Sequence, residues 1–232
     1  MKEFSKFEEL IGVKFKDQNL LRQAFTHRSY INEHKGLGWE HNERLEFLGD
    51  AVLELAVTEY LYEKYPDKPE GDLTSFRAAL VRTTTISEAA SDFNMEEFLL
   101  LSKGESKDKG RARQYILANT FEAVIGAIHL DRGYGKSKEF IEKALFHRTD
   151  EMVEKGLWID DKSLFQEKAQ EEVGITPFYK VLDEKGPDHD KEFEVAVFLN
   201  DEQVAKAKGK SKQGAEQEAA KNALKTKGWS GK

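Results

Sequence analysis

The sequence contains no cysteine, no long apolar run and no N-terminal apolar segment. The absence of cysteine excludes a disulfide framework, a thiolate zinc site and a cysteine nucleophile. Residues 1–13 carry Lys and Glu throughout, so no signal peptide is predicted. No stretch approaches the roughly 18 apolar residues of a membrane span, so no membrane association is predicted either. These absences predict a cytoplasmic protein.

The chain also lacks an excess of positive charge, since its 36 Lys and Arg residues and 43 Asp and Glu residues give a net charge of −7. This total argues against a nucleic-acid partner only if the charge is uniform. Residues 203–232, however, hold eight Lys and two Glu, a net charge of +6. Residues 103–113 form a second basic stretch, between expected helices. Either stretch could be ordinary solvated surface or a phosphate-binding surface.

Hydrophobic periodicity predicts a multidomain chain that begins with an all-α domain over residues 1–155. Apolar residues recur there at helical spacing, and Gly and Pro residues separate the segments. The expected helices span residues 4–11, 18–25, 42–65, 73–92, 113–130 and 136–154. Residues 156–161 are expected to form a linker.

The periodicity changes in residues 162–230, which predict a small α+β domain of order α-β-β-β-α. A short amphipathic helix is expected to end at Gly174. The strands are expected at residues 178–183, 192–199 and 203–208, and a second helix follows Gly209. The basic C-terminal segment is therefore predicted to be half of a folded domain.

The helix expected from Asn42 carries acidic residues along one face. At 100° per residue, four acids fall within an arc of about 80°: Glu43, Glu46, Asp50 and Glu54. The opposite face is the expected core face and carries Leu45, Leu48, Val52, Leu55 and Ala56. The acids have no Lys or Arg four residues later, so they repel one another. A solvated acidic face and a cluster that needs a cation both remain possible, but Phe47 among the acids has no place on a solvated face.

The helix expected near residues 115–130 is apolar almost all round, with a polar notch at Asn119 and Glu122. A buried carboxylate needs a partner. That partner could be Arg44 or Arg77, or a divalent ion shared with the acidic helix. Oxygen-only ligands suit Mg²⁺ or Mn²⁺, and such ions serve phosphoryl transfer or phosphodiester hydrolysis. The spacing alone does not separate a nuclease from a nucleotide pyrophosphohydrolase.

Four segments resemble the ribonuclease III family in order. They read THRS at 26–29, NERLEFLGDAVL at 42–53, EGDLTSFRAALV at 70–81 and ILANTFEAVIGAIHLD at 116–131. Three further segments resemble a double-stranded-RNA-binding domain. They read SLFQE at 163–167, GPDHDKEF at 186–193 and GKSKQGAEQEAA at 209–220. The resemblance covers nearly the whole chain and implies a bacterial-type ribonuclease III.

The resemblance assigns roles to the acidic residues. It implies that Glu46, Asp50 and Glu122 ligate Mg²⁺ and that Asp50 and Glu122 are catalytic. It implies that Glu43 lies in the cleavage site, and that Glu70 reaches or supports that site from the dimer partner.

The candidate site residues also include Asn119 and Phe47. The family more often has Asp at the position of Asn119, and Asn keeps an oxygen ligand but removes one negative charge. We expect Asn119 still to coordinate the metal, directly or through water. The resemblance also implies that Phe47 inserts into a pocket of the partner in a homodimer, although burial within the monomer would be an alternative.

Recognition of A-form RNA falls to shape, 2′-hydroxyls and phosphates. Ser163, Gln166 and Glu167 on the first helix of the small domain are expected to contact the minor groove. The loop that contains His189 is expected to enter a neighbouring minor groove. Lys210, Ser211 and Lys212, at the start of the last helix, are expected to bind phosphates.

We therefore expect a homodimeric, Mg²⁺-dependent endoribonuclease, in which Mn²⁺ could substitute, with no organic cofactor. It would cut double-stranded RNA to 5′-phosphate and 3′-hydroxyl ends with short 3′ overhangs, and process ribosomal RNA precursors and structured messenger RNA. Two alternatives remain. One is a protein that binds double-stranded RNA without cutting it, and the other is a metal-dependent nucleotide hydrolase. The sequence has no Gly-rich phosphate-binding loop, and its His residues do not have the spacing of metal ligands. Neither feature therefore favours another chemistry.

Overall fold

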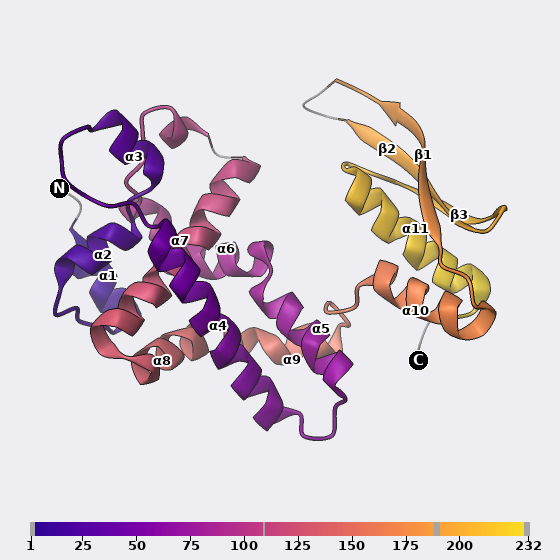
Figure 1. Ribbon diagram of the computed structural model, residues 1–232, viewed down its shortest axis with the longest axis horizontal. Helices are drawn as coiled ribbons and strands as arrows, with labels where there is room; N and C mark the ends of the chain where they lie inside the picture. The colour runs from indigo at the N-terminus through magenta and orange to yellow at the C-terminus, as the bar shows by residue number, and fades with distance from the viewer. Residues whose placement is uncertain (1–2, 109, 188–190, 230–232) are drawn as a thin grey trace. The chain divides into compact units, whose positions relative to one another are not determined.

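The computed structural model describes residues 3–108, 110–187 and 191–229 and divides into two compact units, Met1–Trp158 and Ile159–Lys232 (Figure 1). The first unit is helical. Its α-helices are α1 (Phe4–Ile11), α2 (Gln18–Ala24), α3 (Arg28–Glu33), α4 (Glu43–Lys64), α5 (Glu70–Val81), α6 (Thr83–Asp92), α7 (Arg111–Arg132), α8 (Tyr134–Leu145) and α9 (Thr149–Glu154). Short 3₁₀ turns lie at η1 (Met95–Phe98), η2 (Glu105–Lys107) and η3 (Phe146–Arg148). Together these elements confirm the all-α prediction.

Helices α4 and α7 form the centre of the first unit and pack against each other. Each is 22 residues long. Helix α7 is buried on nearly every side, as its apolar sequence predicts, and Phe121, Val124 and Ile128 are fully inaccessible. Among the described residues, none of the helices is both long enough and apolar enough to cross a bilayer.

Two glycines allow α4 and α7 to approach closely. A Cβ atom added at Gly49 of α4 would lie 1.7 Å from the backbone oxygen of Glu122. A Cβ atom added at Gly126 of α7 would lie 2.2 Å from the backbone oxygen of Leu45. Any side chain at either position would push the helices apart, because backbone atoms cannot yield to it. The two helix backbones therefore meet at the turns that carry the acidic residues.

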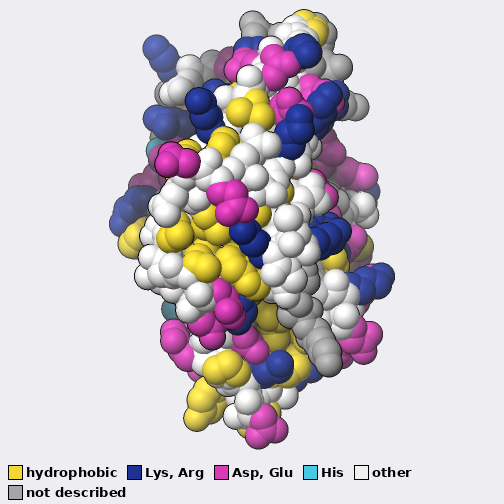
Figure 2. All heavy atoms as spheres, turned by 90° about the vertical axis from the view of Figure 1, so that its right-hand side faces the viewer, with side chains coloured by type: hydrophobic (Ala, Val, Ile, Leu, Met, Phe, Trp, Pro, Cys, Tyr) yellow, Lys and Arg dark blue, Asp and Glu magenta, His cyan; other side chains and the backbone are white. Residues whose placement is uncertain are grey.

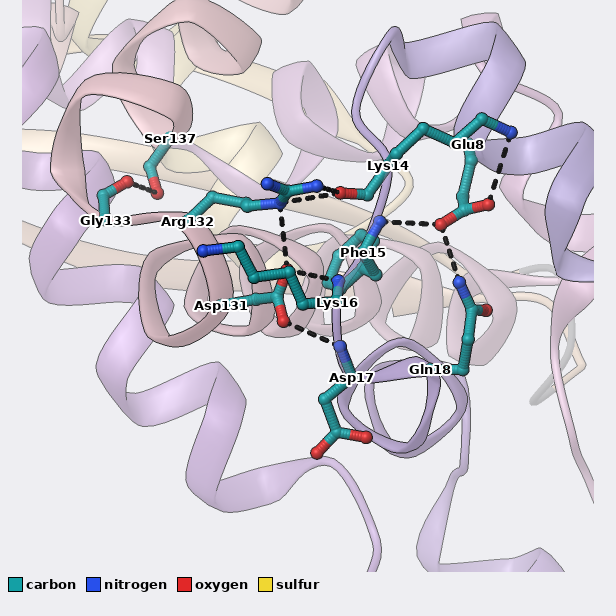
Figure 3. Close-up of polar contacts among 10 residues, drawn as sticks. All are labelled: Glu8, Lys14, Phe15, Lys16, Asp17, Gln18, Asp131, Arg132, Gly133 and Ser137. Atoms are coloured by element: carbon teal, nitrogen blue, oxygen red, sulfur yellow. Dashed lines mark hydrogen bonds and ion pairs between the residues drawn. The ribbon is translucent and has the colours of Figure 1, made fainter.

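Buried carboxylates fasten the segment between α1 and α2 to the end of α7 (Figure 3). Glu8 accepts a hydrogen bond from the backbone N–H of Phe15 at 2.7 Å. Asp131 accepts the backbone N–H groups of Lys16 and Asp17, each at 2.8 Å. These bonds satisfy amides that no helix uses, and they fix the N-terminal helices against the central pair.

The structure corrects four details of the first unit. The helix expected at residues 73–92 is two helices, α5 and α6, because Arg82 adopts an extended conformation with φ −65° and ψ 148°. The helix expected at 136–154 is likewise divided by η3, and α3 was not predicted. Leu55, assigned to the core face of α4, is 49% exposed, so the face that packs is narrower than the wheel indicates.

The second unit confirms the predicted α-β-β-β-α order. It consists of α10 (Asp161–Val173), β1 (Phe178–Lys185), β2 (Glu192–Leu199), β3 (Glu202–Gly209) and α11 (Lys212–Lys227). The strands form an antiparallel sheet of order β1-β2-β3. Strand β1 has an irregular register between Val181 and Asp183.

The two helices and the sheet of this unit enclose a small core that includes Phe165, Val197 and Leu224. Figure 2 shows hydrophobic side chains gathered between charged ones on the face turned to the viewer. Phe178 on β1 stacks on Phe198 of β2 with 5.1 Å between the ring centroids, and Phe178 is 49% exposed. The sheet therefore keeps one aromatic pair outside the core.

Candidate metal and RNA-binding sites

The close crossing of α4 and α7 brings together an acidic cluster, which we define as Glu46, Asp50 and Glu122. Glu46 and Asp50 lie one turn apart on α4. Glu122 comes from α7, and its own backbone oxygen is the atom that faces Gly49. Asn119 lies one turn before Glu122 and is half-buried. The expected ligands thus come from two helices whose separation is set by glycine.

Burial and mutual repulsion dominate the electrostatics of the acidic cluster. Burial raises the pKa of Glu122 to about 8, and the charges on Asp50 and Glu46 add to the rise. Burial also raises the pKa of Glu46, with contributions from the charges of Glu43 and Asp50, whereas a hydrogen bond from Asn119 opposes that rise. The protein holds these carboxylates where their negative charge is costly.

Cations from other helices pair with the two ends of the acidic face of α4, whereas no ion pair is found for Glu46 or Asp50 among the described residues. Arg28 of α3 pairs with Glu43 at 3.3 Å. Arg77 of α5 pairs with Glu54 at 2.9 Å and also donates to the Thr58 hydroxyl at 3.0 Å. The sequence predicted that the self-repelling acids need a compensating cation, and within the described ranges ion pairs supply one only to Glu43 and Glu54.

Arg77 is not the ion-pair partner of Glu122, because its guanidinium group pairs with Glu54 of α4 instead. Within the described ranges, neither Arg44 nor any other cation forms an ion pair with Glu122. A buried carboxylate without a cation is destabilising by several kcal/mol in order of magnitude. The cluster therefore has the donor chemistry and the unmet charge that suit a divalent ion.

The cluster is not closed into a coordination sphere. In the parts of the chain that the structure describes, no three acidic or histidine side chains stand where they could hold a metal ion directly. Three like charges repel, so a bound cation would be needed to draw these side chains together. The carboxylate and amide oxygens fit the preferences of Mg²⁺ and Mn²⁺.

Two predicted site residues, Glu70 and Phe47, are not part of the acidic cluster. Glu70 begins α5 and lines a groove of about 410 Å³ with Thr58 and Tyr62, roughly two turns beyond Asp50 along α4. The structure therefore does not bring Glu70 to the acidic cluster of its own chain. Phe47 is 82% exposed, which excludes its burial within the monomer.

The first candidate RNA-binding surface lies on α10. Ser163, Gln166 and Glu167 are exposed and line one shallow groove along this helix. Asp160 caps the helix by accepting the backbone N–H groups of Lys162 and Ser163. The three predicted residues therefore share one accessible helix face.

The second candidate surface is the start of α11. The Ser211 hydroxyl caps this helix by accepting the N–H of Gly214 at 3.1 Å, so it orders the turn that carries Lys210 and Lys212. Lys212 is exposed, and its ammonium group lies 5.5 Å from the centroid of the Phe193 ring. His189 was also predicted to contact RNA, but it lies outside the described residues.

Sequence reasoning missed the residues that organise the acidic cluster without belonging to it. Gly49 and Gly126 set the helix separation, and their signal was the presence of glycine inside two otherwise regular helices. Arg28 and Arg77 were not predicted as partners of Glu43 and Glu54. Those ion pairs join residues far apart in the chain, so no local spacing reveals them.

The chain is similar to known proteins in both sequence and fold. Residues 17–149 match the family described as Ribonuclease-III-like, and residues 162–227 match the double-stranded RNA binding motif. The chain is 45% identical over 225 residues to Ribonuclease 3 of Enterococcus faecalis, with 96% of each chain covered. It is 47% identical over 213 residues to Ribonuclease 3 of Streptococcus pneumoniae strain Hungary19A-6, with 92% of this chain and 91% of the relative covered.

Solved structures agree for the first unit. A nuclease domain of ribonuclease III from Campylobacter jejuni superimposes with a TM-score of 0.55 at 44% identity, covering 62% of this chain and 96% of that chain. A second structure of that domain, described for flexibility in its dimer-forming region, gives a TM-score of 0.55 at 42% identity and covers 61% of this chain and 98% of that chain.

The fold and the matches define a nuclease with an appended double-stranded-RNA-binding domain. The chain belongs to the ribonuclease III family, a family of metal-dependent nucleases, and it is an endoribonuclease.

Proposed function

We propose that this chain acts as a homodimeric, Mg²⁺-dependent endoribonuclease that cuts double-stranded RNA into products with 5′-phosphate and 3′-hydroxyl ends and short 3′ overhangs. Mn²⁺ would substitute for Mg²⁺. The natural substrates would be ribosomal RNA precursors and structured messenger RNA in the cytoplasm. The observation that carries the proposal is the acidic cluster, in which Glu46 and Glu122 are half-buried: among the described residues it has no ion-pair partner, although both ends of the same face have one.

The acidic cluster would hold the metal through Glu46, Asp50 and Glu122. Bound Mg²⁺ would supply a more acidic water molecule and positive charge for the phosphate oxygens. Until a metal ion is bound, the negative charge of the carboxylates would repel the RNA phosphate. The close helix crossing would hold the two helix backbones at a fixed separation. In the hydrolysis, a water oxygen bonds to phosphorus, the bond from phosphorus to the 3′-oxygen breaks, and a proton ends on the 3′-oxygen.

Asn119 would act on the cluster chiefly through Glu46. Its side-chain amide can donate a hydrogen bond to that carboxylate, which favours the ionised form needed by a metal ligand. An aspartate at this position would add a charge but could not donate that bond when ionised. The amide oxygen remains available to a metal or its water.

The homodimer is supported by an apolar stripe along α4. Phe47, Leu55 and Tyr62 are 82%, 49% and 74% exposed, and they fall on one side of the helix. Large exposed apolar side chains in a row indicate an interface. A groove beside Tyr62 is lined by Glu70, so contact along this stripe would bring Glu70 toward a partner.

Sedimentation of Phe47→Ala should give a lighter species than the unaltered protein, and an unchanged mass would remove Phe47 from the interface.

The duplex would be bound by the two surfaces of the second unit. Exposed Ser163, Gln166 and Glu167 suit 2′-hydroxyls, and Lys210, Ser211 and Lys212 suit phosphates at the start of α11. The loop containing His189 is proposed to contact the minor groove, as in the sequence-based prediction.

Incubation of the full chain with long duplex RNA, with and without Mg²⁺, tests the proposal, and Asp50→Ala is the matched inactive control. We expect cleavage only with Mg²⁺ and only by the unaltered chain, with products sensitive to an exonuclease that requires a 5′-phosphate. Retention of uncut duplex by both proteins would instead favour a binding protein. Turnover of free nucleotides would favour a nucleotide hydrolase.

A further inference from the structure

Arg28 combines a backbone that is held in place with a side chain that is exposed to solvent. The preceding residue, His27, donates its backbone N–H to Leu100 O at 3.1 Å, and Thr26 O accepts the backbone N–H of Asn42 at 2.9 Å. These bonds anchor the start of α3 to the start of α4. The Arg28 side chain, in contrast, is 64% exposed.

The only ion pair described for Arg28 is a single contact. Its Nη1 atom lies 3.3 Å from Oε1 of Glu43, while His41 Nδ1 lies 3.8 Å from the other oxygen of Glu43. An exposed pair of this kind contributes little stability because water solvates both groups. A guanidinium carries five N–H donors in a fork that matches the oxygens of phosphate. Arg28 can therefore exchange its carboxylate partner at small cost.

Arg28 also lies beside the acidic cluster. Glu43 precedes Glu46 by three residues on the same face of α4, where side chains are neighbours. The charge of Glu43 contributes to the raised pKa of Glu46, which is consistent with that closeness. A phosphate near the cluster would meet strong negative potential, and Arg28 is positioned to offset it.

Arg77, at the other end of the same acidic face, forms more bonds than Arg28 and is less exposed. Its Nε atom lies 2.9 Å from Glu54 and its Nη1 donates to Thr58 at 3.0 Å, and its side chain is only 35% exposed. Two bonds to one helix hold that guanidinium in place. The contrast identifies Arg28, not Arg77, as the exchangeable arginine.

We propose that Arg28 binds a phosphate of the RNA strand next to the phosphate at the acidic cluster, exchanging Glu43 for non-bridging phosphate oxygens when the duplex enters. This inference rests on the proposed nuclease function. Arg28 is thus a substrate-binding residue of the first unit, separate from the RNA-binding surfaces of the second.

The test is steady-state cleavage of a fluorescent RNA duplex by the full chain in Mg²⁺ at several salt concentrations, for Arg28→Gln and Arg28→Lys. Lys138→Gln is the control, because it removes the same charge. Lys138 of α8 pairs at 2.9 Å with Glu59 of α4, which lies about two and a half turns beyond Asp50. We expect Arg28→Gln to raise KM by about two- to tenfold, to leave kcat within about twofold, and to reduce the salt slope of log kcat/KM by about one. Arg28→Lys should restore the slope but not all of the affinity, because lysine lacks the planar fork.

An unchanged KM and salt slope in Arg28→Gln would overturn the inference. So would a fall in kcat alone, which would limit Arg28 to positioning Glu43. An equal effect of Lys138→Gln would show a general charge effect and would also overturn it. Failure of the unaltered chain to cleave would count against the proposed function itself, so the two failures are distinguishable. Thermal unfolding of each variant confirms that it is folded.

Discussion

The two units of this chain present their functional groups in opposite ways. In the first unit, Glu122 lies in a core helix, and the approach of α4 to α7 leaves no room for a Cβ atom at two positions. In the second unit, the predicted RNA-binding residues of α10 are exposed on one helix face. A reaction centre needs charges held against their own repulsion, whereas a duplex-binding surface needs accessible groups at the right spacing.

The cost of placing charge differs accordingly. Burial raises the pKa of Glu122 to about 8. The lysines near the start of α11 lie at the surface, where charge is screened within about 8–10 Å at physiological salt. The net charge of −7 therefore describes neither unit, because a phosphate responds to the surface it touches.

The largest predicted effect separates cleavage from binding. Glu122→Gln keeps the size of the side chain but removes a carboxylate that we propose as a metal ligand, so we expect duplex cleavage to fall by at least about 10³-fold. Duplex affinity should change by less than about threefold, because the surfaces of the second unit that we propose to bind RNA are untouched. Cleavage rates and fluorescence anisotropy measure the two effects. A comparable loss of cleavage rate and duplex affinity would contradict the view that the first unit cleaves and the second unit binds.

The next effect concerns the helix crossing. In Gly126→Ala, the new methyl group would lie 2.2 Å from Leu45 O, so the helices must separate. We expect the free energy of unfolding to fall by about 3 kcal/mol, with a loss of cleavage. Urea unfolding measures the first and a cleavage assay the second.

Gly135→Ala is the matched control for that variant. A Cβ atom added at Gly135 meets nothing within 4 Å, and the residue lies in α8, where alanine is the better helix former. Its unfolding free energy should stay unchanged or rise slightly. If Gly126→Ala were as stable as this control, the crossing would not set the geometry of the cluster.

A smaller effect follows from the pKa of Glu122, which is raised from 4.5 to about 8 by burial and by neighbouring carboxylates. Because the folded value exceeds the unfolded one, the contribution to stability is present below pH 4.5 and is lost as the pH rises through about 8. A bound divalent ion requires the ionised form, so metal affinity should increase as the pH rises toward about 8. Calorimetric titrations at pH 6, 7 and 8 measure this trend, and Glu122→Gln should flatten it.

The smallest predicted effect lies in the second unit. Lys212→Gln should weaken duplex binding by a few-fold and reduce the salt slope of log Kd by about one, with kcat unchanged at saturating RNA. Lys221→Gln is the control, since Lys221 lies farther along α11 and its ammonium group is 3.8 Å from Glu218. Equal effects of the two variants would mean that α11 offers a general positive field instead of a defined contact.

Sequence periodicity predicted both folds because each helix and strand buries one regular face. It failed where tertiary structure overrides that pattern. Arg82 interrupts an otherwise continuous helical signal, and Leu55 is exposed although the wheel assigns it to the core. In the second unit the predicted order α-β-β-β-α was correct, because strand alternation and the glycines at helix ends are local features.

The acidic cluster was partly predictable. The helical wheel grouped Glu46 with Asp50, and the buried notch on the next apolar helix identified Glu122, but only the resemblance to a family indicated Glu70. The ion pairs of Arg28 and Arg77 and the contact of Gly49 with Glu122 depend on the relative placement of distant segments. The metal-binding chemistry of the acidic residues could thus be inferred from residue types. The cations that neutralise Glu43 and Glu54 could not.

The most direct test of the central claim, that α4 and α7 together form a divalent metal site, is Mn²⁺ binding to the RNA-free protein followed by electron paramagnetic resonance. The account predicts saturable binding by the unaltered protein, competition by Mg²⁺, and at least about tenfold weaker binding in both Asp50→Ala and Glu122→Gln. Binding of equal strength in all three proteins would contradict it, because the ion would then be held elsewhere.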